Sequence, residues 1–316
     1  MPRRRFIALL FLLFTGTSSF AAYPDKPIKL ISGYPAGGSV DVAARIFGTY
    51  LSAELKQTVI IENRAGASGL IGAVTTANSP ADGYTLYFGV GATMTITPHL
   101  NKEADTTALS RLVPIGGVVE YTNILLVNSA VPVKSLAELV DYAKKNSGTV
   151  TYGSSGIGSS MHLSGELLRQ VTGAPLMHVP YKGAAPAMTD AIGGRITMVF
   201  DVISTAVNHV KGGAVIPLAV TSRKRNPMFP SVPTVAELGY PDYDVTSWFA
   251  LFAPANLPPE ATEKVSAALK AVNANPAFRK KMQENGYELF PADAQQVANR
   301  VRRENEYWAK VISKIQ

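Results

Sequence analysis

The chain has 316 residues, of which 47% are hydrophobic and 17% are charged, and it contains no cysteine. This length allows one large or two medium domains with a substantial core, while the lack of cysteine excludes disulfides, thiolate metal sites and cysteine nucleophiles. The formal net charge of +7 falls to +4 once the three arginines at positions 3–5 are removed, and no lysine or arginine run is interleaved with aromatic residues. We therefore expect no nucleic-acid partner.

Residues 1–21 have the pattern of a cleavable signal peptide. The three arginines precede an apolar run at positions 6–14, which is too short to span a bilayer. Ser19 and Ala21 are small residues of the kind that a signal peptidase reads, so we expect cleavage between Ala21 and Ala22. An uncleaved membrane anchor is the alternative. Since no cysteine is available for a lipid anchor, we expect a soluble mature protein in the periplasm.

The next part of the chain alternates strand patterns with helical patterns. Strands are predicted at residues 27–32, 58–62 and 84–88, and helices are predicted to begin at Ser39 and Leu70. This β-α-β-α-β order predicts a parallel sheet with helices on both faces.

After a poorly patterned region at residues 92–111, a second series of strands and helices follows. We predict strands at 123–127, 149–152, 178–181, 197–201, 215–220 and 248–252. Helices are predicted at 135–145, from the 153–162 turn to a stop at Gly173, near 186–192, at 259–272 and after Asp293. Two such series indicate two α/β domains, with the C-terminal part returning to the first. The predicted domains are 22–121 plus 222–316, and 122–221. A ligand would then lie in the crevice at the carboxyl ends of the strands.

Residues 153–162, Gly-Ser-Ser-Gly-Ile-Gly-Ser-Ser-Met-His, join a predicted strand to a predicted helix that stops at Gly173. The first N–H groups of a helix lack partners, and the helix dipole places partial positive charge there. Glycines let a ligand approach the backbone, so the turn could bind a carboxylate or a phosphate. The alternative is that Ser159 or Ser160 only caps the helix. The local sequence leaves both interpretations open.

Two other glycine-containing loops and one acidic residue also lie at strand ends. Residues 34–39 precede a helix and have the same anion-binding character, unless Gly37 and Gly38 only form a turn that Ser39 caps. Residues 64–69 have the same two interpretations. Asp201 follows a buried strand, where it could cap a helix beginning near Ser204 or accept hydrogen bonds from a ligand.

The sequence lacks the common catalytic and nucleotide-binding motifs. There is no G-x-x-x-x-G-K-[ST], no G-x-G-x-x-G after the first strand and no G-x-S-x-G. The histidines at 99, 162, 178 and 209 have no metal-ligand spacing. These features argue against an enzyme, and we expect neither a metal nor a cofactor.

An ordered set of short motifs covers essentially the whole mature chain. They lie at residues 23–28, 35–38, 62–64, 66–69, 82–86, 152–156, 178–183, 232–234 and 237–239 and at Trp248. With these motifs the chain resembles the substrate-binding proteins of tripartite tricarboxylate transporters, also called the Bug family.

The resemblance implies an α/β, two-domain fold of the type II periplasmic binding proteins, with a parallel-dominated sheet in each domain and a ligand cleft between them. It implies that the 35–38 loop and the 154–159 turn grip a carboxylate, helped by two ordered waters, and that Asp41 and Arg45 are structural. Tyr34 stands where the family usually has a phenylalanine-type residue, so it could stack on a ligand or add a hydroxyl. The expected ligand-binding residues are Tyr34, Ala36, Gly37, Gly38, Ser39, Ala67, Ser154, Ser155, Gly156, Gly158, Ser159 and Asp201.

The function that the resemblance implies is capture of a small organic di-, tri- or aromatic carboxylate. The protein would be a monomer that delivers this ligand to a membrane permease with a large and a small subunit. The alternatives are a periplasmic sensor that presents the ligand to a signalling receptor and a secreted hydrolase.

Overall fold

The computed structural model describes residues 22–100 and 106–313. The predicted signal peptide, residues 1–21, lies outside the described residues, as does part of the poorly patterned region.

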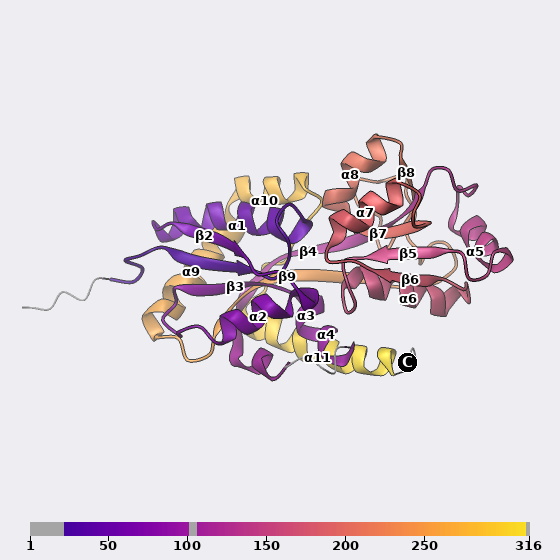
Figure 1. Cartoon of the computed structure of the whole chain (residues 1–316). Coiled ribbons are helices and arrows are strands. Elements are labelled where there is room, and N and C mark those ends of the chain that lie inside the picture. The colour runs from indigo at the N-terminus through magenta and orange to yellow at the C-terminus, as the bar shows by residue number, and fades with distance from the viewer. Residues whose placement is uncertain (1–21, 101–105, 314–316) are drawn as a thin grey trace, which may run out of the picture.

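The described chain forms two lobes that share one mixed sheet, as Figure 1 shows. The strand order is β2-β1-β3-β9-β4-β7-β5-β6, with β10 and β8 paired to β4. The first lobe contains β1–β3, β9 and β10, the second contains β5–β8, and β4 runs through both. The strands are β1 (Ile28–Ser32), β2 (Val59–Asn63), β3 (Thr85–Val90), β4 (Leu112–Asn128), β5 (Thr151–Ser154), β6 (Met177–Pro180), β7 (Met198–Val202), β8 (Val215–Val220), β9 (Thr246–Pro254) and β10 (Glu288–Leu289).

Strand direction differs between the outer and the central strands. β1 pairs in parallel with β2 and β3, and β5 pairs in parallel with β6 and β7, as the alternating pattern predicts. β4 and β9 are antiparallel to their neighbours because they carry the chain from one lobe to the other. The α/β class and the parallel outer strands are therefore confirmed, and the central strands make the sheet mixed.

β4 is the longest strand and changes partners along its length. Residues from Leu112 to Thr122 pair with β9, and residues from Asn123 onward pair with β7 and β8. The predicted domain border at 121/122 lies beside this change, although the division itself stays a prediction.

The helices lie on both faces of the sheet in each lobe (Figure 1). In the first lobe, α1 packs against α9 and α10, while α11 packs against α3, α4 and β4. The helices are α1 (Ser39–Leu55), α2 (Leu70–Ala77), α3 (Gly91–Thr95), α4 (Thr97–Leu100), α5 (Leu136–Lys145), α6 (Ser160–Thr172), α7 (Ala184–Ile192), α8 (Ile203–Lys211), α9 (Pro259–Ala274), α10 (Pro276–Glu284) and α11 (Ala294–Ile312), with short 3₁₀ turns at Ala67–Gly69 and Thr107–Arg111.

Helical spacing accounts for the packing of the first lobe. Ala43, Phe47 and Leu51 are fully buried at every fourth position of α1, which gives the helix one apolar face toward the sheet. On the opposite face of the sheet, the Trp248 indole N–H lies 3.0 Å from both carboxylate oxygens of Glu304, so a hydrogen bond ties β9 to α11.

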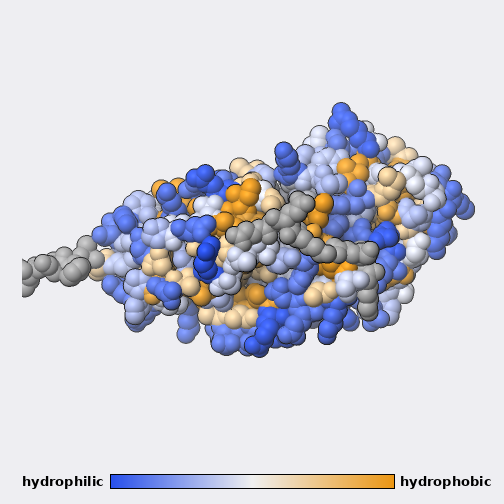
Figure 2. All heavy atoms as spheres, turned by 60° about the horizontal axis from the view of Figure 1, so that its bottom comes forward, coloured by the Kyte–Doolittle hydropathy of each residue, from blue (hydrophilic) through white to orange (hydrophobic). Residues whose placement is uncertain are grey.

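Exposed apolar side chains are scattered. On the face shown in Figure 2, hydrophilic residues predominate and hydrophobic atoms form small separate groups, as expected for a water-exposed surface. Within the described ranges, no helix has both the length and the hydropathy to cross a bilayer.

Candidate ligand-binding site

The N-termini of four helices meet between the two lobes. Each helix follows the carboxyl end of a strand: α1 follows β1, α6 follows β5, α7 follows β6 and α8 follows β7. Ser39, Ser160, Ala184 and Val202, at or beside these helix starts, line one cavity, which we call the inner chamber. Unpaired N–H groups and four helix dipoles therefore favour an anion at this place.

Of these four helix N-termini, only that of α6 has a side-chain cap. Ser159 caps α6 by accepting a hydrogen bond from the His162 N–H at 3.2 Å, so of the two serines that could cap this helix it is Ser159 that does. The N-cap residues of α1, α7 and α8 are Gly38, Gly183 and Val202, and none makes a side-chain cap hydrogen bond. Ser39 is thus the first helical residue rather than the cap. The first N–H groups of these three helices remain free of capping side chains.

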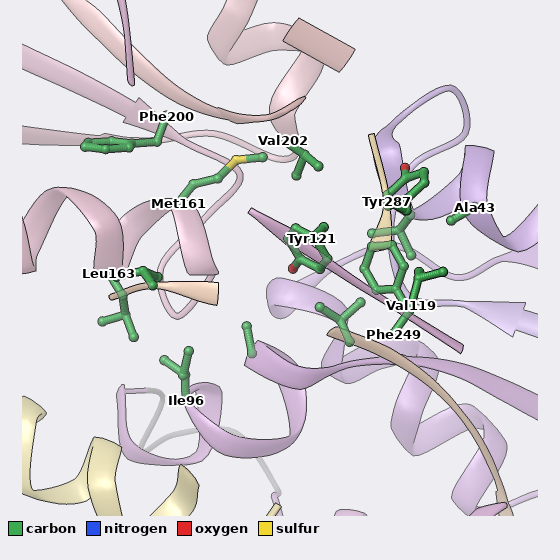
Figure 3. Close-up of a cluster of buried hydrophobic side chains, with 14 of the residues drawn as sticks. Ala43, Ile96, Val119, Tyr121, Met161, Leu163, Phe200, Val202, Phe249 and Tyr287 are labelled. Atoms are coloured by element: carbon green, nitrogen blue, oxygen red, sulfur yellow. The ribbon is translucent and has the colours of Figure 1, made fainter. Parts of the chain in front are cut away.

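The inner chamber has a volume of about 80 Å³ and an apolar floor. Figure 3 shows Met161 and Val202, from the second lobe, on one side of Tyr121, and Phe249 and Tyr287 on the other. Met161, Val202 and Tyr121 line the chamber. Such a site can hold a small polar head against the helix ends and an apolar part against the floor.

A second hollow, which we call the outer chamber, adjoins the inner one on the side of the 3₁₀ turn. It has a volume of about 680 Å³. The two chambers share five lining residues, two from the first lobe and three from the second. These are Tyr34, Pro35, Ser155, Lys182 and Gly183.

Six of the predicted ligand-binding residues line the inner chamber, and six do not. Those that do are Tyr34, Ala36, Gly38, Ser39, Ser155 and Ser159. Ala67 and Gly156 line only the outer chamber. Gly37, Ser154, Gly158 and Asp201 line neither chamber.

Sequence reasoning did not identify the loop that leads into α7. Lys182, Gly183 and Ala184 line the inner chamber. The sequence carries a usable signal, because a predicted strand at 178–181 is followed by a glycine and a helix, as in the other two loops.

The first loop is held from behind by a carboxylate. Asp41 accepts hydrogen bonds from the Gly37 N–H and from the Asn63 amide, both at 2.9 Å, and pairs with Arg45. Burial acts to raise the pKa of Asp41, but these hydrogen bonds and Arg45 together hold it below its usual value. The Tyr34 hydroxyl donates to the Ser68 carbonyl at 2.9 Å, so this hydroxyl is already engaged within the protein.

Ser154 faces the packed interior of the second lobe. It is fully buried, its Oγ lies 2.7 Å from His178 Nε2, and it accepts a hydrogen bond from the Gly156 N–H at 3.2 Å. His178 stacks on Tyr152 and lies 4.2 Å, between ring centroids, from His162. Burial, with a smaller effect of His162, lowers the pKa of His178 to about 4, so the imidazole is neutral at pH 7. The position of Ser154 is that of a residue supporting the turn.

Asp201 also faces away from the chamber. β7 continues to Val202, α8 begins at Ile203, and Val202 is the N-cap residue, so the prediction that Asp201 caps this helix is wrong. Its carboxylate accepts a hydrogen bond from the Val202 N–H at 2.8 Å. Complete burial raises the pKa of Asp201 to about 7.

The two lobes contact each other on both sides of the chambers. The Ser68 hydroxyl of the first lobe donates to the Ile157 carbonyl of the second. On the opposite side, Tyr287 Oη lies 2.7 Å from the Ser39 carbonyl oxygen and 2.9 Å from Ser204 Oγ, which links α1 to α8. The lobes are therefore closed over the inner chamber. Among the described residues, no group of histidine and acidic side chains is arranged to hold a metal ion.

Comparison with known proteins agrees with this arrangement. A family model described as "Tripartite tricarboxylate transporter family receptor" matches residues 43–316. Protein BugT of Bordetella pertussis is 33% identical over 307 residues, which cover 95% of this chain and 94% of BugT. A solved R. palustris protein with adipate has a TM-score of 0.89 at 32% identity, covering 93% of this chain and 98% of that chain. The periplasmic binding protein BugD has a TM-score of 0.86 at 31% identity, with the same coverage. The chain belongs to the tripartite tricarboxylate transporter receptor family.

Proposed function

We propose that this protein is a periplasmic solute-binding protein that captures a small organic carboxylate between its two lobes. The observation that carries the proposal is the convergence of four helix N-termini, from both lobes, on one small chamber. A relative solved with adipate and the receptor family support the same function. The family consists of receptors, which favours a binding protein over a hydrolase.

The ligand carboxylate would lie against the first turns of the helices. In this proposal the loop around Gly38 holds it from the first lobe, and Ser155 and the first N–H groups of α6, at Ser160 and Met161, hold it from the second. Ser159 donates its N–H and its hydroxyl to the Gly156 carbonyl, so it supports the turn. Each hydrogen bond to a charged carboxylate would contribute about 1.5–3 kcal/mol. Because these donors come from both lobes, ligand binding would favour the closed arrangement. Gly37, Ser154, Gly158 and Asp201 would support the loops rather than touch the ligand.

The remaining parts of the proposal concern export and delivery. The signal peptide would direct the chain to the periplasm, and the mature monomer would move as two domains, 22–121 plus 222–316 and 122–221. The closed, loaded form would deliver its ligand to a membrane permease with a large and a small subunit.

A thermal-shift screen tests the binding function. The mature chain would be heated with mono-, di-, tri- and aromatic carboxylates, and with the corresponding alcohols and amines as controls. At about 100 times its dissociation constant, a ligand adds about 2.7 kcal/mol to the free energy of unfolding. We expect only carboxylates to raise the melting temperature, and chromatography to recover them unchanged. Stabilisation by neutral or cationic analogues instead, or turnover of the ligand, would overturn the proposal.

A further inference from the structure

The 178–183 motif, His-Val-Pro-Tyr-Lys-Gly, ends in a lysine that the proposed carboxylate contacts do not use. Lys182 lies between β6 and α7, lines both chambers and is exposed. Among the described residues that line either chamber, it is the only one with a charged side chain.

The positive charge of Lys182 is also uncompensated within the described part of the chain. Its ammonium group makes neither an ion pair nor a hydrogen bond there. Other cations near the loops are paired: Arg45 with Asp41, Arg64 with Glu62 and Arg195 with Asp190. Lys182 is therefore free to pair with a group that enters the cleft.

In the inner chamber, the dipoles and free N–H groups of the helix ends already stabilise the negative charge of one carboxylate. The chamber volume of about 80 Å³ leaves little room for a second charged group. A longer ligand would extend into the outer chamber at the junction that the five shared residues line. Pro35 and Gly183 border this junction and already touch each other, since a Cβ on Gly183 would lie 3.2 Å from Pro35 Cγ. This contact between the lobes narrows the junction, which favours a slim, unbranched spacer.

Apolar side chains line part of the outer chamber, including Ile71, Ile157 and Pro180. They suit methylene groups, and Lys182 offers an anion at the far end of the ligand the one charged partner found among the described lining residues. The helix ends and Lys182 together would not balance the negative charge of a tricarboxylate.

We propose that Lys182 is the specificity-determining residue of the cleft, and that it pairs with the second carboxylate of an unbranched dicarboxylate whose first carboxylate occupies the inner chamber. This inference rests on the proposed function, because it assumes that a carboxylate binds at the helix ends.

Isothermal titration calorimetry with matched ligands tests the assignment. Dicarboxylates would be compared with monocarboxylates of equal length, as succinate with butyrate, adipate with hexanoate and suberate with octanoate. Citrate serves as the branched tricarboxylate. The proteins would be the wild type, Lys182→Met, Lys182→Arg and the control Lys145→Met. Lys145 is an exposed lysine on α5, in the same lobe, and lines neither chamber.

For the best-binding length, we expect the wild type to prefer the dicarboxylate over the monocarboxylate and over citrate. Lys182→Met should weaken dicarboxylate binding about fivefold, as for a solvent-exposed ion pair, and leave monocarboxylate binding unchanged. Lys182→Arg should keep the preference, and Lys145→Met should change nothing.

Four results would overturn the assignment. Equal losses for both ligands in Lys182→Met would mean that Lys182 pairs with the first carboxylate. Unchanged binding of both ligands would remove Lys182 from recognition. A wild type that binds mono- and dicarboxylates equally would exclude a second anion subsite while leaving the proposed function intact. Binding of no carboxylate by the wild type would refute the proposed function as well, and the wild-type titrations alone reveal it.

Discussion

Replacing Asp201 by asparagine should flatten the pH dependence of stability. Asp201 is completely buried, and burial raises the pKa of its carboxyl from 3.8 to about 7, although the Thr205 hydroxyl and the Val202 N–H partly oppose the rise. A carboxyl with a higher pKa in the folded state binds its proton more tightly there than in the unfolded chain. Its stabilising contribution is therefore complete below about pH 3.8 and is lost as the pH rises toward 7.

The size of the effect follows from the same two values. Each pKa unit corresponds to about 1.36 kcal/mol, so ionisation of Asp201 removes up to about 4 kcal/mol from the free energy of unfolding. Between about pH 5 and about pH 8 the wild type should lose roughly 2–3 kcal/mol of this amount. Asparagine has nearly the same shape and keeps an oxygen to accept from the Val202 N–H, but it has no charge to bury.

Urea unfolding at these two pH values measures the difference. The variant should lose about 2–3 kcal/mol less than the wild type between them. Asp141→Asn is a suitable control because it removes a carboxylate from the exposed face of α5 in the same lobe. It should leave the difference between the two pH values as in the wild type. If the stabilities of the wild type and Asp201→Asn changed in parallel, the carboxyl would ionise as an exposed one does, and the reasoning from burial would be refuted.

Three further substitutions test the packing around the site and, at Arg300, the packing of α11 on the sheet. Gly158 and Gly148 have φ values of +84° and +80°, but only at Gly158 would a Cβ meet the other lobe, 3.1 Å from a threonine hydroxyl. Alanine at either position should therefore lower the free energy of unfolding by about 1–2 kcal/mol. Only Gly158→Ala should also weaken ligand binding in calorimetry. Equal ligand affinities of the two variants would contradict the contact between the lobes. Ser154→Ala should destabilise the protein by about 1–2 kcal/mol in urea, since His178 loses its partner, and unchanged stability would count against a supporting role. Arg300→Met leaves the carboxylates of Glu120 and Glu304 without their shared cation and should lower the free energy of unfolding by about 2 kcal/mol or more. Breaking the exposed Lys280–Glu284 pair of α10 should lower it by less than about 1 kcal/mol. Similar losses in urea unfolding would show that the Arg300 pairs contribute no more than an exposed pair.

The alternation of strands and helices was predictable because each outer strand and its helix form a local unit with its own hydrophobic period. The full length of β4 was not predictable, because only its last third has the sequence pattern of a strand. Pro114, Gly116 and Gly117 look like breakers in the sequence, but they lie where the pairing of β4 with β9 shifts register, and bulges tolerate such residues. A Cβ on Gly117 would lie 2.3 Å from the Phe290 carbonyl oxygen. These glycines therefore serve contacts with the C-terminal part of the chain, which local pattern cannot reveal.

Two predicted site residues that line neither chamber, Ser154 and Asp201, share one physical cause. The strand that leads to the second glycine-rich turn was predicted to end at residue 152, but β5 extends to Ser154. Likewise, β7 extends one residue past Asp201, to Val202. Successive side chains of a strand point to opposite faces, so the two neighbouring residues at the end of each of these strands face opposite ways. One of each pair faces the cleft between the lobes and the other faces the interior.

Ser155 and Val202 consequently line the inner chamber, while their preceding neighbours Ser154 and Asp201 do not. Polar residue type favoured Ser154 and Asp201 as ligand contacts, because a serine or an aspartate at a strand end can bind a ligand. In this fold those polar groups satisfy hydrogen bonds behind the turn, to His178 and to the Val202 N–H. At three of the helix ends the first backbone N–H groups carry no side-chain cap, and such groups belong to every residue type except proline. Residue identity therefore says where such a turn lies, but the register of the strand before it decides which side chains line the inner chamber.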